Sequence, residues 1–114
     1  MSERTYLDYL DDIRDSLGKA QAFVAGMTYD EFALDEKTNF AVVRALEIVG
    51  EATKQIPAEL KGRYPHLPWR DMAGMRDKLV HNYFGVNLEV VWETATQEAP
   101  ALEAEIRDLL TKET

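Results

Sequence analysis

The chain has 114 residues and no cysteine, and 21 Asp and Glu against 13 Lys and Arg give a formal net charge of −8. This length supports one domain, residues 1–114, with one core. A composition of 46% hydrophobic and 30% charged residues is typical of a globular protein. The missing cysteines exclude disulfides, Cys-based zinc sites and thiol catalysis. The acidic excess disfavours general duplex DNA binding, because Lys and Arg supply most non-specific affinity.

The start of the chain carries no apolar signal segment, and no stretch approaches the roughly 18 apolar residues of a membrane span. We therefore expect a cytoplasmic protein with no membrane partner.

Two long amphipathic helices are predicted in the first half. Apolar residues at steps of three or four predict a helix over residues 5–25, which Gly26 ends. Thr28 begins a capping-box spacing, S/T-x-x-E, that opens a short helical turn. Asp35 begins a second long helix of about five turns, which Pro57 ends.

The second half begins with residues 57–69, where three prolines predict a loop holding at most one helical turn. A further helix is predicted over residues 69–83, closed by Gly85. Asn87 is a candidate N-cap for the next helix, and Pro100 kinks that helix or begins another. The pattern predicts an all-α, up-and-down bundle of four to five helices.

Arg76 lies on the apolar side of the predicted 69–83 helix. With about 100° per residue, it falls at about 40° from Met72, inside an inward stripe formed by Met72, Met75, Leu79, Val80 and Tyr83. A guanidinium keeps its proton and is costly to bury alone, so Arg76 must meet a carboxylate, a phosphate or a cleft. The structural interpretation is a buried ion pair, for instance with Glu47 or Glu51.

His81 falls near 180° on the same wheel, with Asp77 one turn earlier. Such a carboxylate can fix the imidazole tautomer and raise its basicity, which makes a usable acid–base pair. The alternative is an exposed surface histidine beside an aspartate. Arg76 and His81 diverge by about 140° on an ideal helix. Either the helix end is distorted, or a symmetric second copy completes the site.

Local charge favours RNA near this segment. Between residues 61 and 81, five cations and two carboxylates give +3, which leaves −11 for the rest of the total of −8. A basic strip with interleaved aromatic rings suits single-stranded RNA, whose bases stack on such rings. The cations proposed to contact RNA are Arg63, Arg70 and Lys78, and the interleaved rings are Tyr64, Trp69 and Tyr83. Alternatively, Tyr64 and Trp69 are hinge and core residues.

A separate acidic run, Asp8, Asp11, Asp12 and Asp15, has three interpretations: a Mg²⁺ site, a solvated helix face, or a surface for a basic partner. With no cysteine and only two histidines, the composition favours chemistry without a metal ion or other cofactor.

The segment from Arg76 to Tyr83 has the spacing R-x4-H-x-Y. This spacing resembles the signature of the HEPN superfamily, and specifically of the HepT-like toxins of HepT/MntA toxin–antitoxin systems. Further segments are similar to the family in the same order: FAVVRALEIVGEA at 40–52, LPW at 67–69, AGMR at 73–76 and VVW at 90–92. The resemblance covers nearly the whole chain.

The resemblance implies an α-helical homodimer in which the motif helices of two protomers line one cleft. It implies a metal-independent endoribonuclease, with His81 as the acid–base group and Arg76 on the scissile phosphate. It also implies an MntA-like nucleotidyltransferase antitoxin that silences the toxin by transferring AMP to Tyr83. Asp77 occupies a variable polar position of the motif.

Two other functions are compatible with the sequence. The chain could be a non-catalytic helical subunit that binds nucleotide or presents a substrate to a nucleotidyltransferase. It could also be a purely structural dimer, with Arg76 held in a buried salt bridge.

Overall fold

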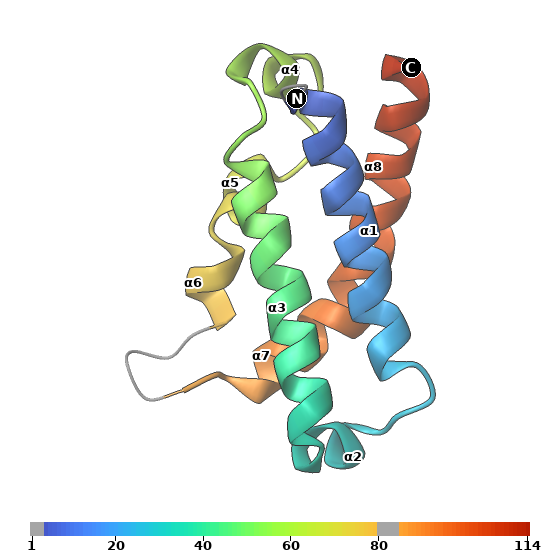
Figure 1. Ribbon diagram of the computed structural model, residues 1–114, viewed down its shortest axis with the longest axis vertical. Coiled ribbons are helices and arrows are strands. Elements are labelled where there is room, and N and C mark those ends of the chain that lie inside the picture. Colours follow the sequence, from blue (N-terminus) through green and yellow to red (C-terminus); the bar gives the residue numbers. More distant parts are fainter. Residues whose placement is uncertain (1–3, 80–84) are drawn as a thin grey trace.

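The computed structural model describes residues 4–79 and 85–114, and three long helices form its frame (Figure 1). These are α1 (Tyr6–Val24), α3 (Glu36–Thr53) and α8 (Ala99–Glu113). α1 packs against both α3 and α8, and the two chain ends lie at the same end of the bundle. The predicted all-α bundle is confirmed. None of the helices in the described ranges is long and apolar enough to cross a membrane.

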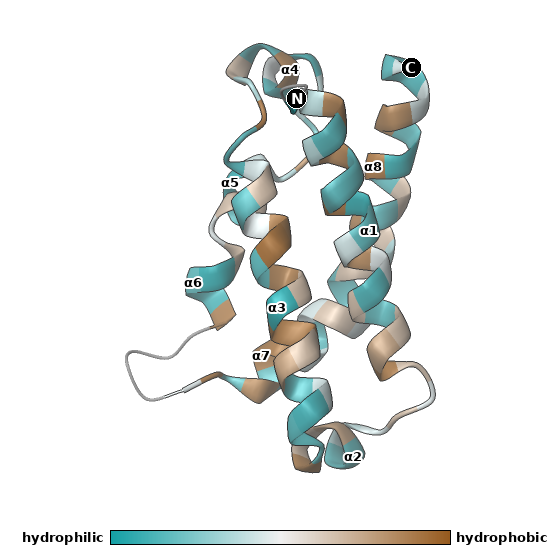
Figure 2. Cartoon of the chain, in the orientation of Figure 1, coloured by the Kyte–Doolittle hydropathy of each residue, from teal (hydrophilic) through white to brown (hydrophobic). Residues whose placement is uncertain are grey.

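Short helices close the bundle and connect its long members. They are α2 (Tyr29–Leu34), α4 (Ala58–Arg63), α5 (Trp69–Ala73), α6 (Met75–Leu79) and α7 (Leu88–Glu93), followed by the π-helical turn η1 (Thr94–Glu98). α4 lies at the end of the bundle that holds the termini, whereas α2 and α7 lie at the opposite end (Figure 1). Figure 2 shows that apolar and polar residues alternate along each long helix, as expected for helices with one buried face.

The predicted helix starts are confirmed by side-chain caps. Thr28 Oγ1, Asp35 Oδ1 and Asn87 Oδ1 each accept a hydrogen bond from the backbone N–H three residues later, at 3.2, 3.0 and 3.2 Å. These bonds satisfy N–H groups that have no partner within the helix. Gly26 has φ +79°, the left-handed conformation expected of a glycine after a helix end.

The prediction of one unbroken helix from residue 69 is wrong. Gly74, with φ −89° and ψ 10°, leaves the helical conformation and separates α5 from α6. Glycine weakens a helix because it loses the most backbone freedom. Residues 80–83 of the predicted helix lie outside the described residues.

The segment 57–69 contains more helix than the predicted single turn. α4 has six residues, and Pro57 stands in an extended conformation at its N-cap. Leu60 is 2% exposed, so burial of this side chain anchors a helix that the surrounding prolines disfavour.

Pro100 lies at the start of a helix, which is one of the two outcomes predicted from the sequence. It occupies the first turn of α8, where a missing N–H costs little. Just before it, the Ala99 N–H bonds to the Thr94 carbonyl five residues back, so the chain passes from α7 to α8 through the π turn η1.

Close backbone packing joins α3 to α5. A Cβ atom at Gly50 would lie 3.4 Å from the carbonyl oxygens of both Met72 and Ala73. A larger side chain at position 50 would therefore push α5 away from α3. Met72, Met75 and Leu79, at 0%, 2% and 0% exposure, fill the adjoining core.

A polar network ties the two chain ends to α4. The Glu113 side chain is 8% exposed and accepts hydrogen bonds from the hydroxyls of Tyr64 at 2.6 Å and Tyr6 at 3.2 Å. Arg63 Nη1 lies 3.3 Å from the same carboxylate. The Tyr64 hydroxyl, and then the Arg63 charge, lower the pKa of Glu113, and the same hydrogen bond raises the pKa of Tyr64.

Because the pKa of Glu113 is lowered on folding, its ionised form stabilises the protein above the ordinary glutamate pKa of about 4.3. This stabilisation is lost as the pH falls through the lowered pKa. We therefore expect wild type to lose more stability than Glu113→Gln between about pH 6 and pH 3, measured by urea denaturation at each pH. Glu105→Gln, at an exposed position of α8, is the control and should follow wild type. Parallel losses in wild type and Glu113→Gln would contradict the assignment.

Candidate functional site

Arg76 projects from α6 and pairs with α3. Its Nε lies 3.3 Å from Oε2 of Glu47, and the two side chains are 59% and 24% exposed. The ion pair with Glu47 is thus present, but its predicted burial is wrong. After the break at Gly74, the five-residue α6 buries only Met75 and Leu79, and Arg76 lies beside this narrow apolar face.

The pairing leaves most of the guanidinium available. Glu47 engages Nε, and neither Nη group of Arg76 bonds to a residue of 4–79 or 85–114. An arginine has five N–H donors in a planar fork that matches two phosphate oxygens. Arg76 is therefore a positioned cation with an exposed, phosphate-compatible edge.

The other residues of the predicted site are distributed as follows. Glu51, one turn after Glu47 on α3, pairs with Arg44 at 3.2 Å and not with Arg76. Asp77 is exposed on α6. His81 and Tyr83 lie outside the described residues, so their predicted roles stay predictions.

The basic candidates do not form one surface. Arg63 belongs to the Glu113 network at the end of the bundle that holds α4, away from α6 (Figure 1). Lys78 Nζ lies 2.6 Å from Oε2 of Glu98. Arg70 is exposed on α5 and has no ion pair within the described ranges. Carboxylates from distant segments thus offset much of the +3 counted along the sequence.

The two aromatic rings before α6 support the fold. Trp69 is 8% exposed, and its indole N–H donates to the Tyr64 carbonyl oxygen at 2.9 Å. The Tyr64 hydroxyl is bound by Glu113. Trp69 is therefore a core residue, the alternative that the sequence left open, and Tyr64 is held in the Glu113 network.

A pocket of about 320 Å³ adjoins α6 on the side of η1 and α8. Its apolar lining includes Met72, Met75 and Leu102, and its polar lining includes Lys78 and Glu98. Sequence reasoning missed Glu98, because nothing in the local pattern links it to a lysine 20 residues earlier.

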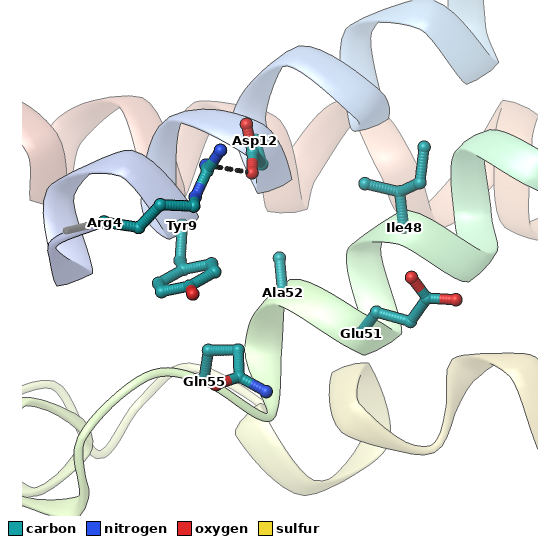
Figure 3. A pocket seen from close by; sticks show the side chains of 7 residues that line it. All are labelled: Arg4, Tyr9, Asp12, Ile48, Glu51, Ala52 and Gln55. Atoms are coloured by element: carbon teal, nitrogen blue, oxygen red, sulfur yellow. Dashed lines mark hydrogen bonds and ion pairs between the residues drawn. The ribbon is translucent and has the colours of Figure 1, made fainter. Parts of the chain in front are cut away.

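A second pocket, of about 450 Å³, lies between α1 and α3 (Figure 3). Two of its polar side chains bond to each other: Arg4 pairs with Asp12, and the Arg4 guanidinium also covers the Tyr9 ring, 4.9 Å from the ring centroid. Figure 3 shows the Glu51 carboxylate pointing away from this pair, along α3. One face of the Tyr9 ring is therefore already occupied by a guanidinium.

The acidic run on α1 is a helix face in which three of the four aspartates form ion pairs, while Asp8 accepts a hydrogen bond from the Thr5 backbone N–H. Asp11 and Asp15 pair with Arg14 and Lys19 at 2.9 Å each, and Asp12 pairs with Arg4. In the part of the chain that the structure describes, no three His, Asp or Glu residues are grouped as metal ligands.

Comparison of the sequence with known proteins finds a matching family and several relatives. The family model described as "Ribonuclease HepT-like" matches residues 13–109, which include the whole R-x4-H-x-Y segment. A protein named as a probable ribonuclease HepT, from Thermococcus cleftensis, is 45% identical over 94% of this chain and 97% of its own length.

Two other relatives are named as inferred RNases. One, from Caldanaerobacter subterraneus, is 46% identical over 79% of this chain and 80% of its own length. The other, from Methanocaldococcus jannaschii, is 44% identical over 91% of this chain and 80% of its own length. No solved structure matches the chain significantly.

Because Arg76 forms an exposed ion pair, we expect Arg76→Met to change the free energy of unfolding by less than about 1 kcal/mol. Met75→Ala, at a neighbouring position that is 2% exposed, should cost about 2–5 kcal/mol. Urea denaturation followed by circular dichroism measures both. A loss for Arg76→Met as large as that for Met75→Ala would show that Arg76 mainly supports the fold.

Proposed function

The chain belongs to the HepT-like ribonuclease family, and we propose that it is an endoribonuclease toxin that cleaves RNA without a metal ion. The observation that carries the proposal is the family match over residues 13–109, since it spans Arg76, His81 and Tyr83 in their motif spacing. The exposed Nη edge of Arg76 supports it, because this edge suits a phosphate.

The proposed reaction needs a base, a cation and an acid. His81 takes the proton of a 2′-hydroxyl, whose oxygen attacks the adjacent phosphorus and displaces the 5′-oxygen of the next nucleotide. Arg76 stabilises the charge that develops on the non-bridging oxygens. The leaving oxygen receives a proton from an imidazolium, and the 2′,3′-cyclic phosphate remains on the upstream fragment.

A homodimer completes the proposed site. Two copies of the R-x4-H-x-Y segment lining one cleft would provide two imidazoles, so that one accepts a proton while the other donates one. Arg70 and Lys78 lie on α5 and α6 and would guide the RNA backbone toward Arg76. Arg63, on α4, would contact only a more distant part of the RNA.

Silencing is proposed to occur at Tyr83. A nucleotidyltransferase antitoxin would direct the Tyr83 hydroxyl onto the α-phosphorus of ATP, which forms an O-adenylyl tyrosine and releases pyrophosphate. Only one residue separates Tyr83 from His81 in the sequence, so the anionic adduct would occupy the phosphate position and repel RNA.

Cleavage of single-stranded RNA in EDTA tests the proposed mechanism. We expect His81→Ala to lower the rate constant by about 10²–10⁴-fold and Arg76→Met by about 10²–10³-fold. Arg107→Met is the control, because Arg107 is also an exposed arginine in a single ion pair, and it should cleave like wild type. Equal rates in wild type, His81→Ala and Arg76→Met would refute the site, and wild-type RNA left intact would favour the non-catalytic subunit.

Intact mass after co-expression with a neighbouring nucleotidyltransferase tests the silencing step. Wild type and Tyr9→Phe should gain the mass of an adenylyl group, whereas Tyr83→Phe should not. The modified protein should cleave RNA at least about tenfold more slowly, because the added negative charge lies beside the scissile phosphate. A wild-type protein of unchanged mass, or an equal gain in Tyr83→Phe, would reject Tyr83 as the acceptor.

A further inference from the structure

Two aromatic rings pack edge to face where α2 meets α7, at the end of the bundle opposite the termini (Figure 1). The ring centroids of Tyr29 and Trp92 lie 6.0 Å apart, with their planes at 75°. Phe32 is fully buried, and its ring centroid lies 5.3 Å from that of Trp92, so it supports the pair from the core. The rings line a pocket of about 230 Å³ together with Glu89 and Glu93.

The side chains of this corner are mostly acidic. The two helices carry four carboxylates, Asp30, Glu31, Glu89 and Glu93, and no Lys or Arg. Within residues 4–79 and 85–114, every recorded ion pair lies on other elements. By contrast, three of the four aspartates of α1 form ion pairs. The aromatic pocket thus lies beside carboxylates that form no ion pair within the described residues.

The combination of ring faces and carboxylates selects one kind of ligand. A cation over an aromatic ring is attracted by the negative face of the π system, and Trp provides the strongest such site. Glu89 and Glu93 are four residues apart on α7, so both carboxylates lie on one side of the helix. A planar guanidinium can stack on a ring and donate two parallel hydrogen bonds, whereas an ammonium cannot.

We propose that the pocket of Tyr29, Glu89, Trp92 and Glu93 binds an arginine side chain presented by a basic segment of a partner protein. The four side chains come from α2 and α7 and include none of the residues assigned to RNA cleavage. The same negative charge would repel an RNA backbone. This inference is independent of the proposed ribonuclease activity, and its test requires no RNA.

The test uses a hexa-arginine peptide and ¹⁵N-labelled protein. The chain has two indole N–H groups, and that of Trp69 is bonded to the Tyr64 carbonyl, so it serves as an internal reference. We expect the Trp92 signal to shift saturably with peptide and the Trp69 signal to stay in place. Hexa-lysine should bind at least about threefold more weakly, because it lacks the planar fork.

Variants separate the pocket from general attraction to an acidic protein. Glu89→Gln/Glu93→Gln should weaken hexa-arginine binding by about tenfold or more. The matched control is Glu59→Gln/Glu105→Gln, which makes the same change in net charge at exposed positions of α4 and α8 and should weaken binding by less than about twofold.

Tyr29→Phe keeps the ring and should bind like wild type, whereas Tyr29→Leu should bind several-fold more weakly. Equal losses in the two glutamine double variants, or equal affinity for hexa-lysine, would overturn the proposal. The glutamine variants decide the question even if Tyr29→Leu fails to fold.

Discussion

The position of Arg76 depends on the packing of a five-residue helix onto α3. Such a helix is too short to be stable on its own, since a helical nucleus is costly and short helices gain little from propagation. α6 is held because Met75 and Leu79 are buried, and because the preceding α5 approaches α3 at Gly50. α3 also carries Glu47, so the contact that orders α6 brings the carboxylate beside the guanidinium. The backbone approach at Gly50 is therefore a condition for the geometry of the site.

The distribution of charge decides what the surface can attract. Three cations of residues 61–81 form ion pairs with carboxylates from distant segments: Arg63, Arg76 and Lys78. A count of charges over residues 61–81 alone therefore overstates the local positive field. These pairs nevertheless differ in kind. Glu113 is nearly buried and fixed by two tyrosines, whereas Arg76 is paired at a solvated position. An exposed ion pair contributes only about 0–1 kcal/mol, so a phosphate can engage Arg76 at little energetic cost.

The sequence predicted features whose cause is local and missed those whose cause is distant. The caps at Thr28, Asp35 and Asn87 each depend on an N–H three residues away, which a single sequence reveals. The break at Gly74 had a local signal, but the apolar periodicity through Met75 and Leu79 outweighed it. The helical-wheel argument treated residues 69–83 as one continuous helix, and it therefore placed Arg76 on the buried face. No pattern indicated the bond from Tyr64 to Glu113, because 49 residues separate the partners.

The proposed RNA site and the proposed arginine pocket use side chains of opposite charge on neighbouring helices. An RNA strand would be attracted to the exposed edge of Arg76 on α6, and a basic protein segment to the carboxylates of α2 and α7. Because the two ligands use different side chains, neither displaces the other by occupying its contacts. Any effect of one on the other must pass through the fold, and binding linkage makes that effect equal in both directions. A partner held at α2 and α7 could thus remain bound while RNA enters or leaves the site at Arg76.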